Sequence, residues 1–202
     1  MTRIKLCGLQ REEDVFAANG IHPDYIGFVF AEKSRRAVTR ETAAGLKKRL
    51  DPEIAAVGVF VNEKPENVAA LLNDGIIDLA QLHGQETPDW IARLRGLTDK
   101  PLIQAFRIRS REDAGAAEAS PADYILLDAG AGDGKTFEWD LAAGVRRPFF
   151  LAGGLTPENA AAAAERLHPF ALDVSSGIET DGVKDPEKMR AFVRAVRGGK
   201  QK

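Results

Sequence analysis

The chain has 202 residues, with 28 Lys and Arg against 30 Asp and Glu and a formal net charge of -2. This length fits one domain, over residues 1–202, and the charge balance gives no reason to expect nucleic acid or an anionic membrane as a partner. No apolar stretch approaches the ~20 residues of a membrane span, and the residues after Met1 lack the apolar core of a signal peptide. The single cysteine excludes an internal disulfide. We therefore expect a cytoplasmic protein.

Short apolar runs typical of β-strands recur along the chain. Their starts are separated by 22, 30, 22, 26, 21, 24 and 23 residues, about what one strand, one helix and two short loops require. The predicted strands are Arg3–Leu6, Tyr25–Phe30, Ala55–Phe60, Ile77–Leu82, Ile103–Phe106, Tyr124–Leu127, Pro148–Ala152 and Ala171–Val174. They predict a single α/β domain with eight parallel strands, a closed (β/α)8 TIM barrel, a fold of roughly 200 residues at its smallest. A doubly wound open sheet is the alternative, but none of the runs is weak enough to be an edge strand.

The segments between these runs carry helix signals. Pro65 and Pro88 stand where a first helical turn is expected, and Gly20 is expected to follow the end of the first helix. The predicted helices are Arg11–Asn19, Thr39–Leu50, Lys64–Asn73, Thr87–Leu97, Ser110–Ala119, Thr156–Leu167 and Asp185–Val196. Because such barrels carry their chemistry on the loops after the strands, the ends of the eight runs should hold the active site.

Small residues follow the last two predicted strands. Gly153 and Gly154 come after the seventh, and Ser175, Ser176 and Gly177 come after the eighth. Glycine lets the backbone approach an anion, and free N–H groups at a helix start attract it. Loops in these two positions predict a phosphate site, although Gly-Gly can also serve only to turn a strand into a helix.

A second glycine-rich segment covers Gly130–Thr136. Its Gly-Lys-Thr resembles the end of a nucleotide-triphosphate loop, but that motif needs glycine where this chain has Ala129, and Phe137 onward does not look like a helix start. We expect instead a flap that covers the substrate.

Three ionisable residues at strand ends are candidates for chemistry. Cys7, at the end of the first strand, could act as a thiolate nucleophile or base, although lone cysteines are most often inert. Asp128, at the end of the sixth, lies at the edge of an apolar core, which favours a raised pKa and a general acid; a capping role is the alternative. Arg36, after the second, could hold a carboxylate through two hydrogen bonds or could be a solvated charge.

Two further residues could line the same pocket. Asp173, at the end of the eighth strand, could bind substrate hydroxyls, and His83, at the end of the fourth, could line the pocket or serve only packing. His22, His83 and His168 show no metal-ligand spacing, so we expect no metal site.

Taken together, these segments resemble the phosphoribosylanthranilate isomerase family, barrel enzymes of tryptophan biosynthesis. The matching segments run in order over nearly the whole chain: Lys5–Gly8, Gly27–Phe30 with Lys33–Arg36, Val57–Asn62, Gln81–Gly84, Leu126–Asp128, Gly134–Phe137, Leu151–Leu155 and Asp173–Glu179. Each motif alone is modest, and their ordered combination is specific.

The resemblance implies an Amadori rearrangement of N-(5-phosphoribosyl)anthranilate to 1-(2-carboxyphenylamino)-1-deoxyribulose 5-phosphate. By the family's pattern Asp128 is the general acid that opens the ribose ring and Cys7 is the base that removes the C2 proton. Arg36 matches the clamp for the anthranilate carboxylate, and the glycine and serine loops match the phosphate grip. No cofactor is expected, and both monomers and homodimers are compatible with such a barrel.

Two departures and three alternatives accompany the resemblance. Asp133 and Glu32 stand where the family usually has other residues, and Asp133 adds negative charge near an anionic substrate. A related indole-forming barrel lyase needs a catalytic lysine, for which only Lys5 is placed near the mouth. The histidine-pathway isomerase uses two aspartates where this chain offers Cys7 and Asp128. A phosphosugar-binding barrel without chemistry is the non-enzymatic alternative.

Overall fold

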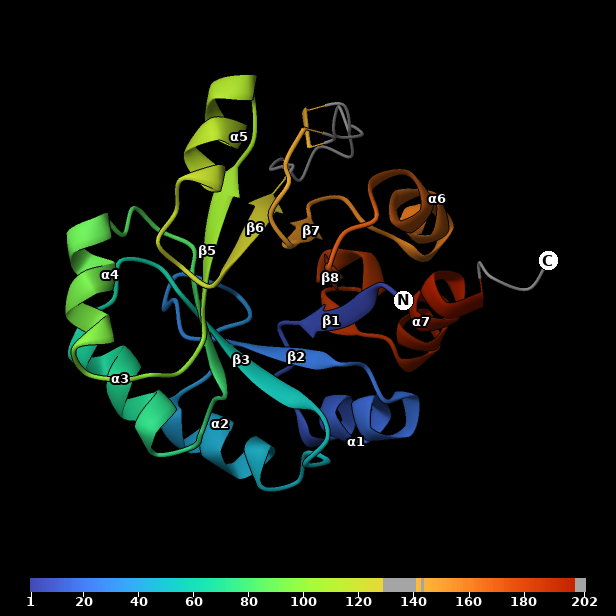
Figure 1. Ribbon diagram of the computed structural model, residues 1–202. Coiled ribbons are helices and arrows are strands. Elements are labelled where there is room, and N and C mark those ends of the chain that lie inside the picture. Colours follow the sequence, from blue (N-terminus) through green and yellow to red (C-terminus); the bar gives the residue numbers. More distant parts are fainter. Residues whose placement is uncertain (129–140, 143, 199–202) are drawn as a thin grey trace.

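The strands form a closed parallel barrel in the order of the chain. The computed structural model describes residues 1–128, 141–142 and 144–198. The strands are β1 (Arg3–Cys7), β2 (Tyr25–Val29), β3 (Ala55–Phe60), β4 (Leu79–Leu82), β5 (Leu102–Arg107), β6 (Tyr124–Asp128), β7 (Phe149–Ala152) and β8 (Ala171–Val174). The last pairs with the first, with Lys5 opposite Asp173. This closure confirms the predicted barrel and excludes the open sheet (Figure 1).

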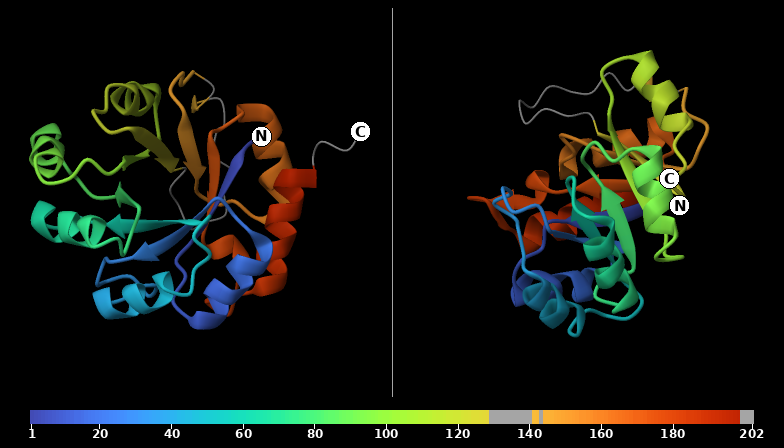
Figure 2. Two further views of the ribbon diagram at one scale, coloured as in Figure 1. Left: turned by 60° about the horizontal axis from the view of Figure 1, so that its bottom comes forward. Right: turned by 90° about the vertical axis from the view of Figure 1, so that its left-hand side faces the viewer.

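Helices surround the ring of strands. Those in the described part of the chain are α1 (Glu12–Ile21), α2 (Arg40–Lys47), α3 (Pro65–Asn73), α4 (Pro88–Arg95), α5 (Arg111–Glu118), α6 (Pro157–Leu167) and α7 (Pro186–Gly198). Figure 2 shows α1 and α7 side by side on the outer surface. The start signals operate as expected, since Thr39 Oγ1 accepts from the Thr42 amide at 3.1 Å and Thr87 Oγ1 from the Trp90 amide at 3.2 Å. Gly20, expected just after α1, lies inside it, because the chain leaves the helix at His22 in a left-handed conformation.

The side chains inside the ring of strands are arranged in layers. Apolar and aromatic groups fill the end where the strands begin: Tyr25, Val57, Leu79, Ile103, Leu126, Phe150 and Ala171. Above them lie three buried polar side chains, Lys5, Gln81 and Asp173. Cys7, Val29 and Val59 form the next layer, toward the strands' carboxyl ends. Because side chains on a strand alternate between its faces, Lys5 and Cys7 both point inward.

An unpredicted hairpin follows β8. After the short 3-10 helix η2 (Ser176–Ile178), β9 (Glu179–Thr180) and β10 (Val183–Lys184) pair antiparallel. Asp181 and Gly182 connect them with φ of 51° and 80°, and positive φ at both central residues is what a type I′ two-residue hairpin turn requires. The expected flap at Gly130–Thr136 lies outside the described residues.

Candidate active site

A cavity of about 280 Å³ opens at the carboxyl ends of the strands. Most of the predicted site residues line it: Cys7, Arg36, His83, Asp128, Gly153, Gly154, Asp173, Ser175 and Ser176. Gly177 does not line it. Its backbone packs against the loop after β7, where a Cβ atom at position 177 would lie 1.9 Å from the Leu155 carbonyl oxygen. Gly177 therefore lets the two predicted phosphate loops touch.

Cys7 lies at the end of β1, paired with Gly27 of β2. Its side chain is buried, and a Cβ atom at position 27 would lie 2.6 Å from its sulfur, so only glycine leaves room for the thiol. Burial raises the pKa of the Cys7 thiol, against the opposing positive charge of Lys5. The thiol is therefore mostly protonated at neutral pH, and the positive charge of Lys5 stabilises the thiolate when it forms.

Asp128 lies across the cavity, at the end of β6. His83 Nε2 is 3.3 Å from Asp128 Oδ2, and His83 Nδ1 is 2.9 Å from the side-chain nitrogen of Gln81. His83 and Asp128 are both partly exposed to the cavity. The carboxyl group is thus oriented by a neighbour on β4's following loop as well as by its own strand.

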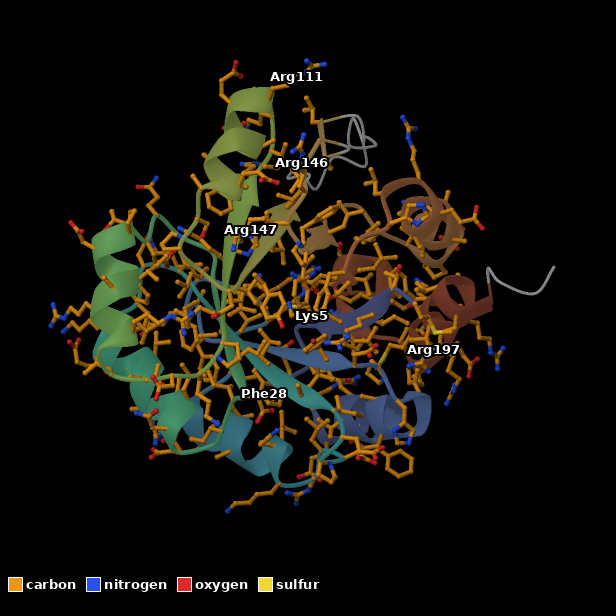
Figure 3. All side chains as sticks on the ribbon, in the orientation of Figure 1. Lys5, Phe28, Arg111, Arg146, Arg147 and Arg197 are labelled. Carbon is orange, nitrogen blue, oxygen red and sulfur yellow. The ribbon has the colours of Figure 1, made fainter. Side chains whose placement is uncertain are left out.

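Lys5 and Asp173 form an ion pair beneath the cavity. Lys5 Nζ lies 2.7 Å from Asp173 Oδ2 and 2.7 Å from Gln81 Oε1, and the lysine is fully buried. Figure 3 shows Lys5 near the centre of the ring of strands. Burial opposes its charged form, but the Asp173 carboxylate overcomes that cost and raises the pKa of Lys5. Asp173 Oδ1 is buried and has no hydrogen-bond partner within the described part of the chain. Asp173 also lines the cavity.

Arg36 is already engaged by a carboxylate of the protein. Its Nε and Nη2 atoms bind Glu179 at 2.6 and 2.9 Å, and Lys184 Nζ binds the same carboxylate at 2.7 Å. Although burial opposes its ionisation, hydrogen bonds from Arg36 and Lys184 hold the pKa of Glu179 at about 2. Glu179 therefore fixes the guanidinium in one orientation, and Arg36 lines the cavity.

We expect Glu179→Gln to lower the free energy of unfolding by about 2–4 kcal/mol near pH 7, because buried Lys184 loses its charged partner. The pKa of Glu179 is about 2 in the fold, below its ordinary 4.5, so its carboxylate stabilises the fold above about pH 4.5. That contribution is lost as the pH falls toward 2. Urea unfolding at several pH values should show the gap between wild type and variant narrowing below about pH 4.5, and a constant gap would contradict this assignment.

The two phosphate-type loops lie side by side at one edge of the cavity. Gly153 and Gly154 adopt φ of 93° and 62°, a conformation that other residues rarely take. The Ser175 hydroxyl donates to the Cys7 carbonyl at 3.1 Å, so it ties the loop after β8 to β1. Lys184 Nζ donates to the Ser175 carbonyl at 2.8 Å and supports the same loop from below.

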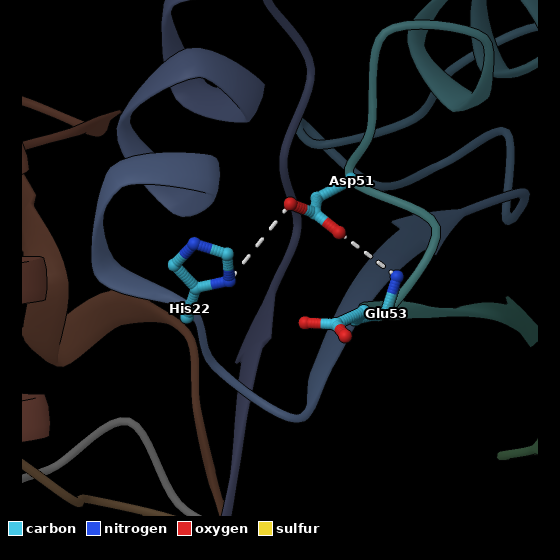
Figure 4. Close-up of side chains that lie close together, drawn as sticks. All are labelled: His22, Asp51 and Glu53. Atoms are coloured by element: carbon cyan, nitrogen blue, oxygen red, sulfur yellow. Dashed lines mark hydrogen bonds and ion pairs between the residues drawn. The ribbon is translucent and has the colours of Figure 1, made fainter.

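Other features of the surface lie away from these residues. A hollow of about 630 Å³ on the outer face, near α1 and the start of α7, contains none of the predicted site residues. Among the described residues, His22, Asp51 and Glu53 place possible metal-ligand atoms within 4.8 Å of one another (Figure 4). They precede β2 and β3, at the opposite end of the barrel, and the Asp51 carboxylate accepts from the Glu53 amide at 2.9 Å.

Sequence reasoning assigned no supporting role at the site to four of the polar residues around it. Gln81 lines the cavity, while Lys5, Glu179 and Lys184 hold Asp173, Arg36 and the loop after β8. Lys5 was considered only as a competing catalytic lysine, whereas it is buried in an ion pair and does not line the cavity. The ion pair of Lys5 with Asp173 could have been predicted from the closed barrel, because closure puts the first and last strands side by side.

The fold and the site together define a (β/α)8-barrel enzyme. Residues 4–195 match the family model described as N-(5′phosphoribosyl)anthranilate (PRA) isomerase, and the chain belongs to this family. It is therefore an isomerase of tryptophan biosynthesis. Within the described residues, no helix has the length and apolar character needed to cross a membrane.

Individual relatives agree over almost the whole chain. The N-(5′-phosphoribosyl)anthranilate isomerase of Endomicrobium trichonymphae is 45% identical, over 98% of this chain and 99% of its own. The crystal structure of the Thermotoga maritima enzyme is 35% identical, with a TM-score of 0.90, over 98% of this chain and 100% of its own. A further phosphoribosylanthranilate isomerase structure, 34% identical with a TM-score of 0.88 over 98% and 100% of the two chains, contains reduced 1-(o-carboxyphenylamino)-1-deoxyribulose 5-phosphate.

Proposed function

We propose that this chain converts N-(5-phosphoribosyl)anthranilate to 1-(2-carboxyphenylamino)-1-deoxyribulose 5-phosphate, with Asp128 as general acid and Cys7 as general base. Asp128 gives a proton to the ribose ring oxygen while the bond from that oxygen to C1 breaks. The nitrogen lone pair forms the C1=N bond of a protonated Schiff base. The Cys7 thiolate then takes the proton from C2, and the C–H electrons form the enolamine, which tautomerises to the ketone.

One observation carries this proposal: Cys7 and Asp128 line a single cavity from strands that are three apart in the ring. An acid that acts on the ring oxygen and a base that acts on C2 need different approaches to one sugar, and separate strands provide them. General acids and bases must reach their reacting atoms through such a shared space. No cofactor enters the scheme, because the protonated Schiff base accepts the electrons of the C2–H bond.

The remaining cavity residues supply anchors for the ends of the substrate. Arg36, fixed by Glu179, faces the anthranilate carboxylate with its remaining donors. The loops at Gly153–Gly154 and Ser175–Ser176 hold the phosphate with backbone N–H groups, for which positive φ at the glycines exposes the chain. Asp173, whose Oδ1 has no hydrogen-bond partner among the described residues, accepts a ribose hydroxyl. His83 binds Asp128 and acts on the substrate through that residue. The enzyme acts as a monomer or homodimer.

The direct test is turnover of freshly prepared phosphoribosylanthranilate, followed by the fluorescence of its anthranilate group. The purified chain should convert it to a product that co-migrates with authentic 1-(2-carboxyphenylamino)-1-deoxyribulose 5-phosphate. Binding of a product analogue without any conversion would instead support the phosphosugar-binding alternative.

We expect Arg36→Met to raise KM by about 10–10²-fold with little change in kcat, because a charged carboxylate contact contributes about 1.5–3 kcal/mol. Arg35→Met is the matched control, since Arg35 also binds Glu179, at 2.7 Å, but does not line the cavity. Steady-state kinetics of both variants decide the point. Equal KM values for the two would remove Arg36 from substrate binding.

We expect Gly27→Ala to lower kcat by about 10–10²-fold, because the new methyl group would lie 2.6 Å from the Cys7 sulfur and displace it. Gly45→Ala is the control. Gly45 lies within α2 with no atom within 4 Å of an added Cβ, so alanine there should keep activity and stabilise the helix by about 0.5–1 kcal/mol. The same kcat for both variants would show that the position of the thiol is not critical.

A further inference from the structure

A chain of four polar side chains runs from Lys5, which is buried beneath the cavity, through Gln81 and His83 to Asp128, which line the cavity. Lys5 binds Gln81, Gln81 binds His83, and His83 binds Asp128, with separations of 2.7, 2.9 and 3.3 Å. Lys5 is on β1, Gln81 is on β4 and Asp128 ends β6. His83 directly follows β4. Lys5 is fully buried and Gln81 nearly so, which makes both costly to place unless they are bonded. The proposed reaction uses neither directly.

The chemistry of Lys5 fixes the direction of the first bond. An ammonium group has donors only, so the atom of Gln81 that faces it must be the carbonyl oxygen Oε1. The Asp173 carboxylate, at 2.7 Å, keeps that lysine charged. The amide of Gln81 therefore cannot turn over, and its NH2 group must point to His83.

The same reasoning fixes the protons of His83. Because the NH2 group of Gln81 only donates, Nδ1 of His83 must offer a lone pair. A neutral imidazole then carries its hydrogen on Nε2, and this N–H group donates to Asp128 Oδ2. Every bond along the chain thus has one direction, from Lys5 toward Asp128.

We propose that Lys5 and Gln81 are positioning residues that hold His83 in the Nε2–H tautomer, so that Oδ2 of Asp128 accepts from His83 and the proton for the substrate is carried on Oδ1. In the other tautomer, Nε2 would present a lone pair to Asp128 and would bind the carboxylic proton on Oδ2. The acid would then be turned toward His83 and away from the ribose ring oxygen. This inference rests on the proposed role of Asp128 as general acid.

The tautomer can be observed without turnover. In NMR spectra of wild-type protein with 15N-labelled histidine, the neutral imidazole of His83 should show Nδ1 as an unprotonated nitrogen and Nε2 as a protonated one. Gln81→Glu keeps the side-chain shape but replaces the NH2 donor with an acceptor, and should move a proton to Nδ1. A neutral wild-type His83 protonated on Nδ1 would overturn the proposal.

Kinetics then test whether the tautomer matters to the acid. Gln81→Glu should lower kcat by about tenfold or more. In a His83→Gln background, where a side-chain amide can donate to Asp128 in any arrangement, the same change should have no further effect on kcat. A charge that merely repelled an anionic substrate would raise KM and would act equally in both backgrounds. The same loss of kcat in both backgrounds would overturn the proposal.

Failure of this inference is distinct from failure of the proposed function. If Asp128→Asn were fully active, the role of Asp128 would be wrong whatever the tautomer of His83. If Asp128→Asn were inactive while Gln81→Glu retained wild-type kcat, Asp128 would remain the acid, and Lys5 and Gln81 would not position it.

Discussion

Replacing Cys7 with alanine is expected to lower kcat by at least about 10², the usual loss when a general base is removed. The substrate's anchors, Arg36 and the two glycine and serine loops, are left in place, so KM should change little. The measurement is fluorescence-monitored turnover of phosphoribosylanthranilate by the wild type and the variant side by side. Circular dichroism and urea unfolding of both proteins establish that the variant keeps the barrel.

The pH dependence adds a second criterion for the same residue. Burial raises the pKa of the Cys7 thiol, so the thiolate fraction of the free enzyme grows as the pH rises through the neutral range. If that thiolate is the base and Asp128 the acid, kcat/KM of the wild type should rise by up to about tenfold per pH unit over the range in which Asp128 stays protonated, and should level off where Asp128 ionises. The residual activity of Cys7→Ala should lack this rise. Wild-type activity in the alanine variant would exclude Cys7 as the base.

The cations around Cys7 favour its thiolate form, which a general base requires, against the effect of burial. Two buried cations, Lys5 and Lys184, act on the sulfur from inside the barrel and from the β9–β10 hairpin. Buried ion pairs contribute little net stability compared with apolar packing. A polar layer within the barrel, built from Lys5, Gln81 and Asp173, is therefore better explained by the chemistry above it than by the stability of the fold.

The barrel could be predicted because its signals are local. Apolar runs such as Ala55–Phe60 and Ala171–Val174 are continuous and regularly spaced, and the structure has strands with the same bounds. Helix ends were less well predicted, since Gly20 was taken as a stop although α1 continues to Ile21. The β9–β10 hairpin was missed because strands of two residues carry no periodicity, although Asp181-Gly182 is a typical hairpin turn.

Most contacts between distant residues at the site could not be predicted. Arg36 and Glu179 are separated by 143 positions, and no local pattern indicates that the predicted carboxylate clamp is itself held by a carboxylate. The contact between Lys5 and Asp173 was within reach, because barrel closure pairs the first and last strands. The orientation of the Gln81 amide could not be predicted, because it depends on contacts among Lys5, Gln81 and Asp173, which come from three different strands.

The second large effect is expected for Asp128→Asn, which should lower kcat by at least about 10², because an amide cannot give the ring oxygen a proton. The amide oxygen can still accept from His83 Nε2, so the shape of the cavity and KM should be nearly unchanged. Asp89→Asn is the matched control, as Asp89 is exposed in the first turn of α4, away from the cavity. It should keep full activity.

Asp128→Asn and Cys7→Ala should also differ in the reaction step that limits turnover. Asp128→Asn retains Cys7 and should still bind substrate, so single-turnover mixing should show binding without ring opening. Wild-type kcat in Asp128→Asn would remove Asp128 from the mechanism and leave the protonation of the ring oxygen to another group. Equal losses in Asp128→Asn and Asp89→Asn would point to a general effect of lost charge rather than to a general acid at the end of β6.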